Sequence, residues 1–268
     1  MKSGTTEADL ARGLEQVLGA VDGFDRPVRV VGLRRLSGGA SRETWSFVAD
    51  GRNLIVQRVR PGLAMGGPSS AVEDHLLVAA ARAGVPVPEV VADAAACTAM
   101  LGDARITAHV GGETLGPRIV RDERFAPARK VLAVQCAEAL AAIHSIDPDT
   151  VTATLASTAR EVAPQPGAAG VAGDPPEGLA PVDTLGRIRE GLDLLDEARP
   201  AFELALRWLQ DHRPPERTVA VVHGDFRVGN LIVGEDGLRA VLDWELAHLG
   251  DPLEDLGWLC VRAWRFGG

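Results

Sequence analysis

The sequence predicts an α+β protein of two lobes, in which a small antiparallel sheet with a helix is followed by a mainly helical part. Segments rich in β-branched residues, separated by Gly-containing turns, are concentrated before residue 110. Longer segments with apolar residues at helical spacing follow residue 111. With 268 residues, of which 46% are hydrophobic, the chain is long enough to bury a core in each lobe. We therefore expect an N-terminal lobe over residues 1–110 and a C-terminal lobe over residues 111–268.

The N-terminal lobe is expected to begin with a helix and three strands. Thr6 and Asp9 have the spacing of a helix N-cap with an acidic first turn, and this helix would run to about Leu18. Asp50-Gly51 predicts a hairpin between two of the strands, because both residues tolerate positive φ. The three expected strands are Val28–Leu36, Thr44–Ala49 and Asn53–Val59.

A second helix and two short strands complete this lobe. The helix is expected from Ser70 to Ala83, where Gly84 provides a C-terminal stop. The two further extended segments are Val85–Val91 and Arg105–Val110. Gly111-Gly112 then ends the strand pattern.

The C-terminal lobe is expected to consist mainly of helices. Pro127–Ser145 carries its apolar residues on one broad helical face. Asp183–His212 predicts helix again, with an interruption near Pro200. Ala163–Pro181 is rich in Pro, Gly and Ala and predicts a surface loop. Short strands are expected at Val219–Val222, Leu231–Val233 and Ala240–Leu242.

Composition and charge argue against several classes of protein. A net charge of −9 without any extended Lys/Arg run argues against a nucleic-acid partner. No segment has the apolar length of a signal peptide or a membrane span, so we expect a cytoplasmic protein with no membrane partner. The three cysteines lack the spacing of a zinc site or a disulfide framework, which favours free thiols in a reducing compartment.

The densest cluster of chemically active residues is His223-Gly-Asp-Phe-Arg-Val-Gly-Asn230, followed by Asp243-Trp-Glu245. A loop between two strands can direct Asp225 and Asn230 toward one point. A carboxylate at position 243 and the amide oxygen of Asn230 suit a hard cation, which leaves Asp225 free to accept a hydroxyl proton. Each residue alone is also typical of a turn, but the full set in this order favours a phosphate-transfer site.

The run His-Gly-Asp-x-x-x-x-Asn followed by Asp-Trp-Glu resembles the aminoglycoside phosphotransferase family, which has the two-lobed protein-kinase-like fold. The longer match, which extends to Pro252, is most similar to the branch associated with acyl-CoA dehydrogenases. It departs from the drug-modifying members, which more often have His and Pro after the Asp. The resemblance implies that Asp225 is the catalytic base, that Asn230 and Asp243 hold metal, and that Arg227 offsets charge on the transferred phosphoryl group.

The resemblance also implies a phosphate-covering loop in the N-terminal lobe. Ser37-Gly-Gly-Ala-Ser41 is similar to the loop over the ATP phosphates, whose backbone N–H groups can approach them closely. Gly38, Gly39 and Ser41 would then bind the nucleotide, although a plain hairpin loop has the same composition. Residues 105–112 would connect the lobes and hold adenine through backbone groups.

A cation and a glutamate are expected beside that loop. Arg58 lies where kinases carry the lysine that contacts the phosphates, and Arg60 is two residues on, on the same face of the strand. Both are also compatible with a solvated strand edge. Glu73 has the spacing of the ion-pairing glutamate of the family, but it is equally compatible with an ordinary exposed helix acid.

Three other groups are expected to be structural. His223 would orient the loop rather than transfer protons, and Asp251-Pro-Leu-Glu254 has the composition of a helix start, although Asp255 could reach the site. The tryptophans expected in the core or in a pocket wall are Trp244, Trp258 and Trp264.

Together these features predict an ATP- and Mg²⁺-dependent small-molecule kinase that phosphorylates a substrate hydroxyl. The resemblance suggests a hydroxyacyl-CoA as the acceptor, and an aminoglycoside or amino alcohol is the alternative. A CoA ester would need a basic surface, for which the candidates are Arg118, Arg121, Arg124, Arg129 and Lys130.

Two other classes of function stay open on the sequence. A non-catalytic nucleotide-binding pseudokinase is one, because Arg58 replaces the usual lysine. An inactive fragment is the other: family members usually continue into further helices, whereas this chain ends at Gly268, so the C-terminal lobe could be truncated.

Overall fold

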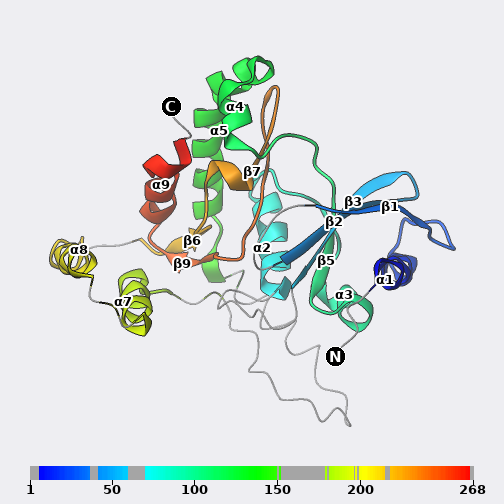
Figure 1. Cartoon of the computed structure of the whole chain (residues 1–268), viewed down its shortest axis with the longest axis horizontal. Helices are drawn as coiled ribbons and strands as arrows, with labels where there is room; N and C mark the ends of the chain where they lie inside the picture. Colours follow the sequence, from blue (N-terminus) through cyan, green and yellow to red (C-terminus); the bar gives the residue numbers. More distant parts are fainter. Residues whose placement is uncertain are drawn as a thin grey trace, which may run out of the picture.

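The computed structural model describes residues 6–36, 42–59, 70–149, 151, 179, 181–195, 197, 199–214 and 218–265. The first part of the chain forms a five-stranded antiparallel sheet in the order β1-β2-β3-β5-β4. Its strands are β1 (Val30–Arg35), β2 (Arg42–Ala49), β3 (Arg52–Val59), β4 (Val90–Ala92) and β5 (Ala104–Ala108). A mainly helical part lies beside this sheet (Figure 1). The two-lobed α+β architecture is therefore the predicted one.

Three helices cover the sheet: α1 (Glu7–Ala20), α2 (Ser70–Arg82) and α3 (Ala94–Leu101). The predicted cap of α1 is present, because Thr6 and Asp9 exchange side-chain and backbone hydrogen bonds as a capping box. Helix α3 was not predicted. Its boundary signals are nevertheless in the sequence, since Asp93 caps its first turn and Gly102, at φ 74°, follows its last residue.

The two faces of the sheet have different neighbours. One face packs on α1 and α3 through a buried cluster that includes Leu14, Phe47 and Ile106. The opposite face is directed toward α2 and the helical lobe (Figure 1). Strand register decides which side chains reach each face, because a residue shares its face with the residue paired opposite it. Thus Gln57, paired with Arg105, lies on the face toward the helical lobe.

The helical lobe is built around α5 (Ala126–His144), which packs against two short two-stranded sheets. The first sheet pairs β6 (Ala220–Val222) with β9 (His248–Gly250), and the second pairs β7 (Leu231–Gly234) with β8 (Gly237–Val241). The remaining helices are α4 (Gly116–Arg121), α7 (Thr184–Leu194), α8 (Pro200–Asp211) and α9 (Leu253–Leu259), with short 3-10 segments at Glu123–Phe125, Val228–Asn230 and Arg262–Arg265. Strand β9 was not predicted.

Two expectations for this lobe, the helix interruption near Pro200 and the loop at residues 163–181, can be compared with the structure. The expected interruption near Pro200 separates α7 from α8, and both helices lie at the edge of the molecule (Figure 1). The loop expected at residues 163–181 lies almost entirely outside the described residues. Along the described ranges, no helix combines the length and the apolar character that crossing a membrane requires.

Candidate active site

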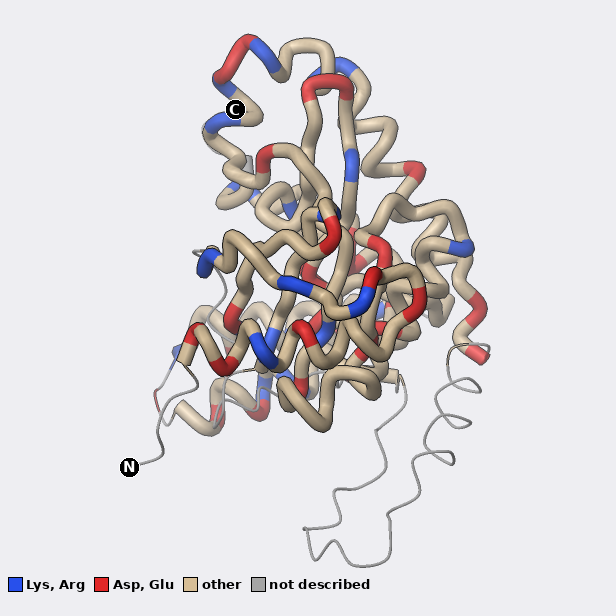
Figure 2. Tube along the Cα trace, turned by 90° about the vertical axis from the view of Figure 1, so that its right-hand side faces the viewer, with Lys and Arg blue, Asp and Glu red and all other residues tan. Residues whose placement is uncertain are grey.

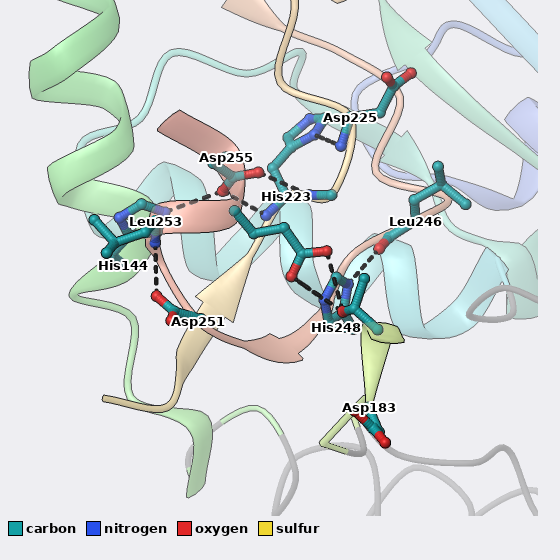
Figure 3. A network of polar contacts seen from close by, with 12 residues as sticks. His144, Asp183, His223, Asp225, Leu246, His248, Asp251, Leu253 and Asp255 are labelled. Carbon is teal, nitrogen blue, oxygen red and sulfur yellow. Dashed lines mark hydrogen bonds and ion pairs between the residues drawn. The ribbon is translucent and has the colours of Figure 1, made fainter. Parts of the chain in front are cut away.

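The loop that follows β6 is fixed by one buried carboxylate. Asp255, on α9, accepts hydrogen bonds from the backbone N–H groups of His223 and Gly224, each at 2.9 Å (Figure 3). The same carboxylate lies 3.0 Å from Nε2 of His144, at the end of α5. Asp255 is fully buried. Two helices and the loop are therefore joined at a single side chain, to which the sequence interpretation gave no definite role.

Glycine is required at the next position of the loop. Gly224 has a φ of 79°, which L-residues with a side chain adopt at a cost. A Cβ placed there would also collide with the backbone carbonyl oxygen of Leu246. The positive φ and the close approach to Leu246 therefore both require glycine where the loop passes the segment between Asp243 and β9.

His223 connects the loop to the strand that leads to Asp243. Its Nδ1 accepts a hydrogen bond from the backbone N–H of Asp225 at 3.2 Å, so its Nε2 carries the proton donated to the carbonyl of Leu242 at 3.0 Å. Burial lowers the pKa of His223, which favours this neutral form. The imidazole thus orients the two segments, as the sequence predicts.

Replacement of Asp255 tests this anchoring. We expect Asp255→Ala to lower the free energy of unfolding by about 3 kcal/mol or more, because it leaves buried N–H groups of the loop without an acceptor. Asp251→Ala is the matched control: the Asp251 carboxylate accepts the exposed Leu253 N–H at the start of α9, and losing such a hydrogen bond costs about 1 kcal/mol. Urea unfolding of both variants measures the difference, and equal losses would contradict the anchoring role.

The Asp225 carboxylate is surrounded by hydrogen-bond donors. Arg227 donates from Nε at 2.9 Å, Asn230 from Nδ2 at 2.6 Å and Trp258 from Nε1 at 2.6 Å. The structure therefore brings together three residues that the sequence interpretation placed in one site, and it adds Trp258, which had been expected in the core or in a pocket wall. No sequence signal distinguished Trp258, because it lies 33 positions from Asp225.

Asn230 and Asp243 can hold a divalent cation. Asn230 is buried, and because its Nδ2 is bonded to Asp225, its amide oxygen is left to serve as a ligand. Burial, with the Glu245 carboxylate nearby, raises the pKa of Asp243 to about 6. The negative charge of Asp243 is therefore not fully neutralised by neighbouring cations. Asp243 also has a φ of 65°, in a region where Asp is tolerated.

Asn230 and Asp243 fit Mg²⁺ when a bound nucleotide supplies further oxygen ligands. No group of three or more His, Cys, Asp or Glu side chains in the described ranges is arranged to hold a metal by itself. Mg²⁺ commonly uses one or two protein oxygens together with phosphate oxygens of a bound nucleotide. The Asp243 carboxylate and the Asn230 amide oxygen could supply these protein ligands.

A cavity of about 250 Å³ lies between the sheet and the helical lobe. Asp243 lines it on one side, and the connecting segment at His109, Val110 and Gly112 lines its end. Apolar side chains from both lobes complete the wall, namely Leu36, Ile55, Leu77, Ile232 and Leu242. The cavity is therefore an apolar slot lined in part by the connector, with the charged residues Arg42, Glu73, Arg105 and Asp243 in its wall.

The charged wall of this cavity holds a buried ion-pair cluster. Glu73 is fully buried, with one oxygen 2.8 Å from Nη1 of Arg42, and Arg42 Nη2 also contacts its carboxylate. Arg105 donates to Glu73 at 2.8 Å, and its Nε lies 3.2 Å from Asp74. Glu73 is thus a paired cavity residue rather than an exposed helix acid.

Arg58 does not line this cavity. It is paired with Glu43 in the strand register, on the face shared by Trp45 and Val56 and directed toward α1 and α3. The expectation that Arg58 contacts the phosphates is therefore corrected by its placement: Arg42, one position from Glu43, occupies the cavity face. The other candidate, Arg60, lies outside the described residues. Gly38, Gly39 and Ser41 lie outside them as well.

The protonation of Asp74 makes the unfolding free energy of the protein depend on pH. Burial raises its pKa to about 6 from an ordinary 3.8, so the folded protein binds more protons than the unfolded chain between these pH values. Its contribution to stability is then lost as pH rises through that window. Relative to Asp74→Asn, the wild type should lose about 2.5 kcal/mol of unfolding free energy between pH 4 and pH 7. A difference that stays constant across this range would contradict the raised pKa.

The basic surface considered for a CoA ester is largely paired internally. Arg118 and Arg124 lie 3.1 and 3.5 Å from Glu113, and Arg129 donates to two backbone carbonyls. Figure 2 shows acidic and basic residues interspersed along the described trace. Any anion bound there would compete with these existing contacts.

The chain is similar to known phosphotransferases in sequence and in fold. A sequence model of the phosphotransferase enzyme family matches residues 32–268. Acyl-CoA dehydrogenase family member 11 of Gallus gallus is 28% identical over 240 residues, which cover 87% of this chain and 28% of that protein. The chain thus spans less than a third of the length of this curated relative.

Solved structures show the same fold. Macrolide 2'-phosphotransferase from Brachybacterium faecium superposes with a TM-score of 0.57 at 19% identity, covering 92% of this chain and 75% of that one. A thermostable mutant of an aminoglycoside phosphotransferase, solved with AMP-PNP and hygromycin B, superposes with a TM-score of 0.55 at 17% identity, with the same coverage. The predicted kinase-like fold is therefore confirmed.

Proposed function

The chain belongs to the phosphotransferase enzyme family, and we propose that this phosphotransferase moves the γ-phosphoryl group of ATP to a hydroxyl group of a small molecule. The observation that carries the proposal is the direct hydrogen bonding of Asp225 to Asn230 and Arg227, beside a cavity that Asp243 lines. A base, two oxygen ligands and a cation are the parts that phosphoryl transfer requires.

In the proposed reaction, Asp225 accepts the proton of the acceptor hydroxyl while that oxygen forms a bond to the γ-phosphorus. The bond from the γ-phosphorus to the bridging oxygen breaks, and ADP leaves. Arg227 offsets negative charge on the transferred group. Asn230 and Asp243 would hold Mg²⁺, which neutralises phosphate charge when bound.

Arg42 is the cation that we assign to the nucleotide phosphates. It is nearly buried, faces the cavity and is oriented by Glu73 from α2. Its Nε also lies 4.0 Å from Glu245, so it stands between α2 and the Asp243 segment. The loop with Gly38, Gly39 and Ser41 is proposed to cover the phosphates beside it, as the sequence predicts.

The nucleobase would occupy the apolar slot at the connector. The N–H groups of Ala108 and His109 are already bonded to carbonyls of Glu89 and Asn53. Backbone N–H donors to the base would therefore come from the residues beyond His109, toward Gly112. The part of residues 105–112 that can donate N–H groups to the nucleobase is therefore shorter than the sequence predicts.

For the acceptor we propose a hydroxyacyl-CoA, with an aminoglycoside or amino alcohol as the alternative. The name of the acyl-CoA dehydrogenase relative supports the first choice. An exposed leucine also follows the metal-binding segment, since Leu246 lies beside Gly224 with 46% of its surface exposed (Figure 3). An apolar group near the base suits an acyl chain better than a polycationic sugar.

A non-catalytic nucleotide-binding protein is the alternative of another class. The intact hydrogen-bonded set around Asp225 supports catalysis instead. Phosphate transfer from ATP or GTP, with and without Mg²⁺, to hydroxyacyl-CoAs, aminoglycosides, choline and homoserine decides between these functions. Transfer to one acceptor class supports the proposal. Tight nucleotide binding with no transfer to any acceptor would favour the non-catalytic protein or an incomplete acceptor site.

A further inference from the structure

Helix α9 presents two consecutive contacts to the catalytic loop. Asp255 and Trp258 are three positions apart, so they lie on the same face of the helix. Asp255 bonds the loop backbone at His223 and Gly224, and Trp258 bonds the Asp225 side chain. The anchoring of α9 therefore sets where the indole N–H lies relative to the catalytic carboxylate.

The three donors around Asp225 are not equivalent. Asn230 and Arg227 belong to the catalytic loop itself and have other roles, as a metal ligand and as a charge-offsetting group. Trp258 comes from a different element, is neutral and has 38% of its surface exposed. Its indole can leave Asp225 without stranding a buried charge. Among the donors, Trp258 is the one that an incoming hydroxyl can replace.

Trp258 packs beside a second tryptophan near Asp225. Its ring meets that of Trp264 edge to face at 5.4 Å, and the guanidinium of Arg227 lies over Trp264 at 4.7 Å. The Nε1 of Trp264 is buried and has no hydrogen-bond acceptor within the described chain. The two indoles thus form an apolar wall beside Asp225 in which one N–H still lacks a partner.

We propose that Trp258 is a positioning residue of the acceptor site. Without an acceptor its N–H occupies Oδ1 of Asp225, and the acceptor hydroxyl takes that place while the indole remains as a wall. This inference rests on the proposed function. It predicts that the contact also restrains water from reaching Asp225, and so suppresses hydrolysis of ATP.

Hydrolysis of Mg·ATP to ADP and phosphate, without any acceptor, tests the proposal. Trp258→Phe keeps an aromatic ring and removes the N–H, so hydrolysis should rise about tenfold or more, the rate equivalent of a hydrogen bond to a charged carboxylate. The KM for ATP should stay within about twofold. Trp208→Phe is the control, because Trp208 lies on α8, stacked on His212 and away from this site. The double variant with Asp225→Asn should lose the gain.

A general structural defect in Trp258→Phe would lower the rate of ATP hydrolysis. An increased rate therefore indicates that the Trp258 N–H restrains hydrolysis in the wild type. The proposal is overturned if Trp258→Phe hydrolyses ATP at or below the wild-type rate, including the case in which neither protein shows any hydrolysis. Calorimetric titration of the wild type with Mg·ATP separates this failure from that of the proposed function. Absence of binding would remove the proposed function itself, whereas binding without the gain would remove only the role of Trp258.

Discussion

Replacing Asp225 with asparagine is expected to lower kcat about 10²- to 10⁴-fold while leaving Mg·ATP affinity nearly unchanged. Asparagine keeps the size of the side chain, but its single amide oxygen can accept from only one of Trp258 and Asn230, and it cannot take a proton from the acceptor. Single-turnover transfer measures the chemical step, and calorimetry measures nucleotide binding. The substitution should therefore slow the chemical step and leave nucleotide binding in the cavity nearly unchanged.

The matched control is Asp236→Asn. Asp236 lies in the turn between β7 and β8, where it contacts Arg239 at 3.1 Å on the surface. This variant should retain the wild-type kcat. If Asp225→Asn keeps more than a tenth of the wild-type kcat, Asp225 is not the base and the proposed reaction must begin differently.

Arg42→Met is expected to raise the KM for ATP about 10- to 100-fold, whereas Arg58→Met should change it less than about threefold. Charge-assisted hydrogen bonds to phosphate have the strength that the larger effect requires. The two arginines lie on the adjacent strands β2 and β3 but on opposite faces of the sheet. They therefore compare two strand arginines on opposite faces, of which Arg42 is also paired with Glu73.

Arg42→Lys provides the check on folding. Lysine keeps the charge beside Glu73 but loses the two-pronged contact, so its KM should lie between those of the wild type and Arg42→Met. Thermal unfolding should show that all three variants fold. A larger effect at Arg58 than at Arg42 would restore the assignment drawn from the sequence resemblance.

The regular parts of the fold followed from local patterns. The Asp50-Gly51 turn predicts the β2–β3 hairpin, and both residues have positive φ in the structure. The capping residues Thr6 and Asp9 likewise predict where α1 begins. These features depend on interactions within a few residues, which a sequence displays directly.

The arginine that we propose for the nucleotide phosphates could not be predicted in the same way. A change of one residue in strand position moves a side chain to the other face of a sheet. The spacing that selected Arg58 gave its distance along β3, but the pairing of β2 with β3 decides that Gln57 and Arg42 face the cavity. Only the three-dimensional register distinguishes these alternatives.

The contacts of α9 escaped prediction for a different reason. Asp255 and Trp258 act on residues 32 and 33 positions earlier in the chain. No local pattern marks such partners, and the composition of residues 251–254 is explained by a helix start alone. Their roles depend on how α9 packs beside the catalytic loop.

The position of α9 has a consequence for synthesis on the ribosome. The N-terminal sheet is complete once β5 has emerged, so this lobe can begin to fold while the rest of the chain is still being translated. The catalytic loop emerges later, and its backbone anchor Asp255 follows about 30 residues after it. A nascent chain that has exposed Asp225 but not yet Asp255 therefore has an unanchored loop, and competence for phosphate transfer should arise only when α9 leaves the exit tunnel.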